Sequence, residues 1–150
     1  MITITKATPK DIPALRDMII KLCAFHGDPC HLGLAEAQAQ LIDGPLQAFI
    51  ARHDGQIGGY AVLEPHWRPM NTGPAWDIVH LFVEEPLRGR GVGRELIKAA
   101  KEFASTSKAC RLTIGTSPDN PGAAAAYRAI GLDEITATPG ARFSVPLCQT

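Results

Sequence analysis

Apolar residues recur along the chain with two different spacings, and each spacing predicts one type of element. Residues 2–7 read ITITKA, in which apolar and polar side chains alternate as in a half-buried strand. From Thr8 to Phe25, with Pro9 at the first helical position, apolar residues recur every three or four positions, which predicts a helix with one buried stripe. A weaker helical pattern covers residues 34–42. The chain is therefore predicted to begin with a strand and two helices.

A hairpin is predicted next. Residues 46–64 read as two strands around Asp54-Gly55, a dipeptide typical of tight hairpin turns, so the two strands should be antiparallel. Residues 65–75 are rich in Pro and Gly and end the hairpin. The apolar run WDIVHLFV, residues 76–83, then predicts a fourth strand.

A glycine-rich loop follows, and after it the chain returns to regular patterns. Residues 92–104 carry apolar side chains at helical spacing, and residues 110–116 predict a fifth strand. A strand, helix and strand in this order form a right-handed crossover, which would make the fourth and fifth strands parallel neighbours.

The last part of the chain predicts one more helix and two short strands. Residues 119–131 indicate a helix that is entered through Asn120 and Pro121 and ends at a glycine. Residues 132–139 and 141–147 are predicted to form strands joined at Pro139-Gly140. The whole chain is thus expected to be one α/β domain, residues 1–150, with a mixed sheet and helices on both faces.

Composition excludes several classes of partner. The 150 residues are 45% hydrophobic and 20% charged, as expected for a globular domain with a substantial core. Fifteen Lys and Arg balance fifteen Asp and Glu, so no overall charge would attract nucleic acid or an anionic membrane. The first residues lack the pattern of a signal peptide. We therefore expect a cytoplasmic protein without a nucleic-acid or membrane partner.

One cluster of sulfur and imidazole side chains could in principle bind a metal ion. Cys23, His26, Cys30 and His31 lie within nine residues, and thiolate with imidazole is a ligand set of zinc. Their spacing matches no common zinc finger, and the other two cysteines, Cys110 and Cys148, do not form a second pair. We predict no metal and reduced thiols, with Cys23 in the core.

The glycine-rich loop, within LRGRGVGREL at residues 87–96, is a candidate anion site. A helix that begins here presents free backbone N–H groups and its positive dipole end, and glycines let a large anion approach them. The loop lacks the Gly-Lys-Ser/Thr of a Walker motif and the glycine spacing of a dinucleotide fingerprint. The alternative is a surface turn with solvated arginines. The residues of the candidate diphosphate cradle are Arg88, Gly89, Arg90, Gly91, Val92, Gly93 and Arg94.

Two spaced motifs give the chain a family resemblance. The sequence LFVEEPLRGRGVGRELI resembles the acyl-CoA-binding motif of the GNAT family of N-acetyltransferases, with Arg88, Gly91 and Gly93 at its recurrent positions. A second motif of that family is matched by Asn120, Ala123, Tyr127 and Gly131. The order of predicted elements is also similar to the GNAT fold from the first strand to the last.

The resemblance implies a fold, a cofactor and a reaction. It implies that strands four and five splay apart, and that acetyl-CoA, the co-substrate, lies between them and bonds to the backbone of Leu81, Phe82 and Val83. Asn120 and Tyr127 are implied to contact the cofactor as well. The implied activity is transfer of the acetyl group to a primary amine of a small molecule or peptide by direct attack in a ternary complex. Homodimers are implied through the late strands.

The resemblance also implies two catalytic groups. Tyr127 is placed to protonate the departing CoA thiolate, the alternative being a packing role. Asp77 is the first candidate for the base, with His80, Glu64 or water as alternatives. Strand alternation places Asp77 with Val79 and Leu81 on one face, and His80 on the other. The competing function is a non-catalytic CoA-sensing or protein-interaction module.

Overall fold

The computed structural model describes residues 1–66, 72–116, 120–136 and 140–147. The chain divides into two compact units, Met1–Gly115 and Thr116–Thr150, which are described here one after the other. The first unit contains the sheet, and the second contains the last helix.

A five-stranded sheet forms the centre of the first unit, with its strands in chain order. The strands are β1 (Ile2–Lys6), β2 (Gln47–His53), β3 (Gln56–His66), β4 (Ala75–Val83) and β5 (Arg111–Ile114). The first four pair antiparallel and β5 pairs parallel to β4, which confirms the predicted hairpin and crossover. At the hairpin, Asp54 and Gly55 have φ angles of 52° and 85°, as the tight turn requires.

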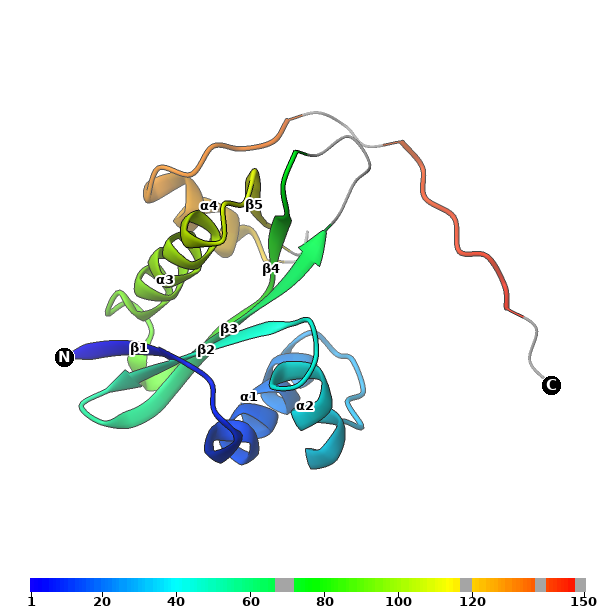
Figure 1. Cartoon of the computed structure of the whole chain (residues 1–150). Helices are drawn as coiled ribbons and strands as arrows, with labels where there is room; N and C mark the ends of the chain where they lie inside the picture. Colours follow the sequence, from blue (N-terminus) through cyan, green and yellow to red (C-terminus); the bar gives the residue numbers. More distant parts are fainter. Residues whose placement is uncertain (67–71, 117–119, 137–139, 148–150) are drawn as a thin grey trace. The chain divides into compact units, whose positions relative to one another are not determined.

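Helices cover both faces of the sheet. Figure 1 shows α1 (Ile12–Phe25) and α2 (Leu34–Leu41) on one side and α3 (Val92–Thr106) on the other. One buried cluster joins α1 and α2 to β2 and β3 through residues such as Leu15 and Tyr60, and a second joins α3 to the opposite face through Leu96. We call these two sides of the sheet the α1 face and the α3 face.

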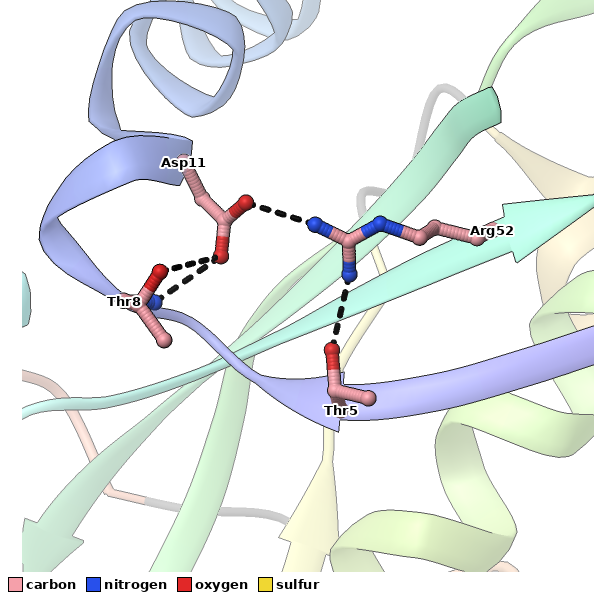
Figure 2. Close-up of polar contacts among 4 residues, drawn as sticks. All are labelled: Thr5, Thr8, Asp11 and Arg52. Carbon is pink, nitrogen blue, oxygen red and sulfur yellow. Dashed lines mark hydrogen bonds and ion pairs between the residues drawn. The ribbon is translucent and has the colours of Figure 1, made fainter. Parts of the chain in front are cut away.

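The start of α1 is held by a buried ion pair. The predicted helix begins with a short 3-10 turn, η1 (Pro9–Asp11), before α1 proper. Figure 2 shows Asp11, which is 5% exposed, between Thr8 and Arg52. Its carboxylate accepts hydrogen bonds from the Thr8 backbone N–H at 2.9 Å and from Arg52 Nη2 at 2.6 Å. Because Arg52 also bonds Thr5, this network fastens the helix to β1 and β2.

A β-bulge interrupts β4. Val62 of β3 lies opposite His80, but the next residue, Leu63, lies opposite Ile78. Val79 therefore has no partner in β3 and is an extra residue in the strand. It is 38% exposed.

The bulge corrects the predicted faces of β4. Ile78 before it and Leu81 after it both pack in the α3-face cluster. In an unbroken strand, two residues three positions apart would point to opposite faces. Asp77 therefore points to the α1 face, the same face as His80 and Phe82. The prediction that Asp77 and His80 lie on opposite faces is wrong, because it assumed an unbroken alternation of side chains.

Strand β5 pairs along its whole length with only the first part of β4. The parallel pairing joins Ala75–Ile78 to Arg111–Ile114, and β5 ends there. From residue 79 to Val83, β4 continues with β3 on one edge and, among the described residues, no strand on the other. This unpaired edge is where the implied splay of strands four and five was expected.

The second unit contains α4 (Pro121–Ala129), which confirms the predicted helix. The strands predicted at residues 132–139 and 141–147 are not found among the described residues, which leaves the sheet with five strands. Residues 140–147 are all exposed, Pro146 lacks a backbone donor, and a strand forms only when a neighbour completes its hydrogen bonds. Pro139, part of the predicted turn, and Cys148 lie outside the described residues.

Candidate active site

Two glycines of the loop have a backbone conformation that other residues rarely adopt. Gly89 has a φ of 76°, and Gly91, the residue that precedes α3, has a φ of 86°. A Cβ added at either position would meet no protein atom within 4 Å. The backbone conformation, rather than crowding by the protein, therefore requires glycine here, and the space above both residues is open.

The loop leads directly into the first turn of α3, where backbone N–H groups have no acceptor within the helix. Val92 and Gly93 are the first two residues of this turn. The Val92 side chain is buried against the sheet, so only its backbone can serve a ligand. A Cβ on Gly93 would lie at an ordinary 3.9 Å from Val83 Cγ2. The geometry suits an anion that rests on the helix start.

The loop is fastened to the end of β4. The Arg88 Nε donates a hydrogen bond of 2.9 Å to the Val83 carbonyl, and the guanidinium carbon lies 6.0 Å from the centre of the Phe82 ring. A guanidinium has five N–H donors, so this bond orders Arg88 and leaves other donors free. Arg90 and Arg94 are exposed.

A second pair of glycines shapes the same corner, and sequence reasoning missed it. A Cβ on Gly58 would lie 2.1 Å from Leu87 Cδ1, and one on Gly59 would lie 2.7 Å from the Phe82 carbonyl oxygen. The backbone contact at Gly59 excludes any side chain, whereas a side chain at Gly58 would require Leu87 to turn away. The doublet Gly58-Gly59 in an apolar strand was the available signal, because glycine inside a strand often marks a close backbone approach.

The predicted cofactor strand has ordinary core side chains. Phe82 packs in the α1-face cluster, and Leu81 and Val83 pack in the α3-face cluster. The side chains of these residues are therefore committed to packing. What they offer a ligand is the backbone along the unpaired edge of β4.

The α1 face of the sheet carries a row of polar side chains next to this edge. Thr113 Oγ1 donates a hydrogen bond of 2.6 Å to Asp77 Oδ1. Glu64 lies directly opposite Asp77 in the β3–β4 pairing, so both carboxylates point to the same face. Together with His80, these residues make up what we call the polar row: Glu64, Asp77, His80 and Thr113.

His80 is held by a buried tyrosine. The Tyr60 hydroxyl lies 3.2 Å from His80 Nδ1, and Tyr60 is fully buried. Burial, with the nearby Cys23 and Cys30, raises the pKa of Tyr60 far above its usual range, so the phenol stays protonated. Burial, with the charge of His26, lowers the pKa of His80.

These shifts favour one assignment of hydrogen-bonding roles in the pair. A buried hydroxyl without an acceptor would be costly, so Tyr60 donates to Nδ1 of a neutral imidazole. The proton of that imidazole is then on Nε2, and its one lone pair is already used. In this arrangement His80 is a hydrogen-bond donor toward its surroundings rather than a base. Tyr60 and Thr113 were both missed from sequence, although each is a polar residue within an apolar strand.

The remaining predicted residues lie in the second unit. The Asn120 Oδ1 accepts a hydrogen bond of 3.2 Å from the Ala123 backbone N–H, so its side chain caps α4. Tyr127 lies about two turns further along the helix, and burial raises the pKa of its hydroxyl. Its phenol is therefore protonated at neutral pH.

No metal site is evident in the part of the chain that the structure describes. Within residues 1–66, 72–116, 120–136 and 140–147, no group of three or more His, Cys, Asp and Glu side chains is arranged to hold an ion. The cluster around Cys23 and His26 is included in that statement. Among the same residues, no helix is long and apolar enough to cross a membrane.

Comparison with known families identifies the chain. The model of the acetyltransferase (GNAT) family matches residues 15–132, which include the glycine-rich loop and α4. The chain belongs to the GNAT family. It is 28% identical to YhfO of Bacillus subtilis, an uncharacterized N-acetyltransferase, over 89% of this chain and 91% of that protein. It is 31% identical to an aminoglycoside N(6')-acetyltransferase type 1 of Salmonella typhimurium, over 73% of this chain and 76% of the relative.

Solved structures agree with the GNAT assignment. The aminoglycoside N-acetyltransferase AAC(6')-Iy, solved in complex with CoA, superposes with a TM-score of 0.79 at 23% identity, over 97% of this chain and 96% of that one. The same enzyme was also solved with a bisubstrate analogue that joins CoA to acetylneamine. This GNAT protein is accordingly an acyl-CoA-dependent N-acetyltransferase, as the two sequence motifs predicted.

Proposed function

We propose that this protein transfers the acetyl group of acetyl-CoA to a primary amine by direct attack in a ternary complex. The observation that carries the proposal is the junction of the open glycine loop at the start of α3 with the unpaired edge of β4. A diphosphate on the loop and an extended thiol arm along the strand would together match CoA. AAC(6')-Iy, which shares this fold, binds CoA, and this supports CoA as the ligand.

On the cofactor side, backbone groups carry most of the proposed binding. The N–H groups of residues 91 to 94 receive the diphosphate, and Arg88, already ordered by Val83, lies beside them. The arm of the cofactor adds to β4 as a strand would, bonding to the backbone of Leu81, Phe82 and Val83. A strand N–H there also stabilises the oxyanion that forms on the thioester.

On the acceptor side, we assign the base to Asp77, acting directly or through water. An alkylammonium has a pKa of about 10, so it must lose a proton before its nitrogen can attack. The Asp77 Oδ1 is held by Thr113, which leaves Oδ2 available. Glu64, opposite Asp77 and more exposed, is the second candidate, whereas the only lone pair of His80 is bonded by Tyr60.

The proposed reaction balances as follows. The amine gives its proton to the base, and its nitrogen bonds to the thioester carbonyl carbon. The resulting tetrahedral intermediate collapses, the carbon–sulfur bond breaks, and the CoA thiolate leaves. Tyr127, whose raised pKa keeps it protonated, gives its proton to sulfur, and the second proton that the nitrogen loses as the amide forms returns to Tyr127 through water.

For the acceptor, we propose a small polycationic amine of the aminoglycoside class. Glu64 and Asp77 side by side on the polar row provide negative charge for a molecule with several ammonium groups. The relative from Salmonella typhimurium is named for this substrate class. A peptide N-terminus carries a single ammonium group, so the carboxylates of Glu64 and Asp77 would attract it less strongly.

A panel of amines tests the proposal. Aminoglycosides, diamines, amino acids and short peptides are each incubated with acetyl-CoA, and release of CoA thiol is followed. Thermal stabilisation by CoA is measured in parallel. We expect both stabilisation and turnover, fastest with an aminoglycoside. Stabilisation without turnover of any amine would favour a CoA-sensing module, and no stabilisation would contradict both functions.

We further propose that both units act within one domain and that the chain forms a homodimer in the cytoplasm. Phe143, Val145 and Leu147 are 87%, 76% and 78% exposed, and these alternating apolar side chains are suited to pairing with a second copy. Light scattering at micromolar concentration tests the assembly, and a monomer would contradict it.

A further inference from the structure

The imidazole of His80 offers a ligand one free ring nitrogen. Its Nδ1 lies 3.2 Å from the Tyr60 hydroxyl, and the two rings meet edge to face with their centroids 6.0 Å apart. In the part of the chain that the structure describes, Nε2 has no hydrogen bond, and the buried polar side-chain atoms without a partner are Arg16 Nε, Gln47 Oε1 and Trp76 Nε1. Since Nε2 is not one of these buried atoms, it is open to solvent or to a ligand.

Tyr60 holds the other side of this ring from within the core. It is fully buried in the α1-face cluster, and its ring also packs against Phe82, with the centroids 5.9 Å apart. A buried hydroxyl is costly without an acceptor, and Nδ1 is the acceptor that it meets. With Nδ1 occupied, the imidazole proton is on Nε2, which can then only donate. Burial lowers the pKa of His80, which keeps this donor uncharged.

His80 and Asp77 occupy consecutive positions on the α1 face of the β3–β4 pairing. Their partners in β3, Val62 and Glu64, are two residues apart, because the bulge at Val79 absorbs the extra residue of β4. Two residues of a strand span about 7 Å. A molecule whose nitrogen rests on the Asp77 carboxylate can therefore reach Nε2 with an atom two or three carbons away, through a hydrogen bond of about 2.9 Å at each end.

The atom that meets the Nε2–H group must be a hydrogen-bond acceptor. A hydroxyl or ether oxygen has lone pairs for this purpose, whereas a methyl group and an ammonium group have none. A substrate without such an oxygen would displace water from Nε2 and leave the donor unpaired, which costs free energy. The polar row is thus arranged for an amine and an oxygen on the same small molecule.

We propose that His80 donates a hydrogen bond from Nε2 to an oxygen two or three carbons from the reacting nitrogen, and so selects amino alcohols and amino sugars as acceptors. His80 is then a specificity-determining residue that touches the acceptor, and Tyr60 is a positioning residue that acts through it. The kinetic part of this inference rests on the proposed function, whereas binding of the oxygen does not require turnover.

Two matched amines test the selection. Ethanolamine and propylamine have the same number of heavy atoms and differ in a hydroxyl that replaces a methyl group. We expect kcat/KM of the wild type to be at least about tenfold higher for ethanolamine, mainly through KM, because a site built for a hydroxyl disfavours the analogue that lacks it. Equal kcat/KM values for the two amines would overturn the proposal.

Three variants locate this preference. His80→Gln keeps an amide donor at about the reach of Nε2, so the preference for ethanolamine should stay within about threefold of wild type. His80→Asn is one methylene shorter and keeps a polar group beside Tyr60 only, so the preference should fall to about twofold or less. Tyr60→Phe removes only the hydroxyl that holds the ring and should give an intermediate preference, with unchanged acetyl-CoA affinity. An undiminished preference in His80→Asn would overturn the proposal.

NMR signals of the His80 ring nitrogens test oxygen binding without turnover. In the CoA-bound wild type we expect a proton on Nε2 and none on Nδ1, and a mixture of the two tautomers in Tyr60→Phe. Ethanolamine should shift the Nε2 signal and propylamine should not. A proton on Nδ1 in wild type, or equal shifts with both amines, would overturn the proposal. A shift with ethanolamine alone in a protein that acetylates no amine would contradict the proposed function and leave the role of His80 supported.

Discussion

In the proposed function, the free edge of β4 binds a ligand through backbone groups, whereas on its α1 face the same strand presents polar side chains that make specific bonds. Leu81 and Val83 only pack, and the groups left for a cofactor are N–H and C=O. Asp77 and His80 instead make specific bonds to Thr113 and Tyr60. The contrast indicates how one strand can bind an invariant donor and a variable acceptor.

Because backbone groups are the same at every position, the cofactor side depends on conformation and open space. Gly89 and Gly91 supply the conformation, and Gly58 admits Leu87 so that the loop can sit against the sheet. The acceptor side depends on which side chains occupy four positions of the polar row. Substitutions on the two sides should therefore differ both in size and in the kinetic constant that they change.

The largest effect is expected at Asp77. Asp77→Asn retains an acceptor for Thr113 but cannot take a proton, so we expect kcat/KM for the amine to fall about a thousandfold, within the range for general base catalysis. The acidic limb of the pH profile should change with it, and acetyl-CoA affinity should not. Thr113→Val is the control, because it removes only the hydrogen bond and should cost about tenfold or less. Full activity in Asp77→Asn together with loss in Glu64→Gln would assign the base to Glu64.

Next in size is the expected effect at Tyr127. Tyr127→Phe removes one oxygen and keeps the ring, so kcat should fall about a hundredfold while acetyl-CoA affinity changes little. Since burial raises the pKa of Tyr127, the alkaline fall in kcat should lie above the ordinary phenol value of about 10, and it should vanish in the variant. An unchanged kcat and pH profile would make Tyr127 a packing residue.

Substitutions in the candidate diphosphate cradle should weaken CoA binding to different degrees. Gly93→Ala adds a Cβ in ordinary contact with Val83 and no backbone strain, so a loss of acetyl-CoA affinity of about tenfold would come from obstruction of the anion. Gly91→Val adds a positive φ that a branched residue strains to adopt, and should lose more. Arg90→Ala removes one exposed charge and should lose about fivefold at most. Isothermal titration with CoA measures all three, and wild-type affinity in Gly91→Val would exclude the cradle.

The smallest effect concerns stability and pH. Because burial lowers the pKa of His80 in the folded chain, the unfolded chain binds its proton more readily. The neutral His80 thus stabilises the fold above the unfolded pKa of about 6.5, and this contribution is lost as the pH falls through the folded value. Urea unfolding across this range should show a shallower acidic decline in His80→Asn, which keeps an acceptor near Tyr60. An identical decline in both proteins would contradict the assignment of a neutral His80.

Much of the backbone geometry around the glycine-rich loop and β4 could be predicted from the sequence because its requirements are local. A glycine-rich segment before a helical pattern is sufficient to predict where α3 starts, and the hairpin at Asp54-Gly55 follows from two adjacent residues. The crossover from β4 to β5 follows from the order of elements. These are statements about neighbours in the chain.

The acceptor side could not be predicted in the same way because it depends on register. The extra residue Val79 reverses the alternation of β4, and no feature of WDIVHLFV marks it. Contacts such as Tyr60 with His80 and Thr113 with Asp77 join strands far apart in sequence. The two late strands were predicted from alternating apolar residues and are not found among the described residues. Alternation shows that a segment could be a strand, but it does not provide a partner strand.

The bulge at Val79 has a consequence for how such a protein changes over generations. It lies between the part of β4 that holds Asp77 and the part whose backbone we propose binds the cofactor. Loss of this one residue would exchange the directions of every side chain upstream of it, whereas point substitutions upstream leave the downstream backbone undisturbed. If the proposed sites are correct, the strand has two independently variable halves, and acceptor preference can diverge among descendants that all inherit one unaltered donor site.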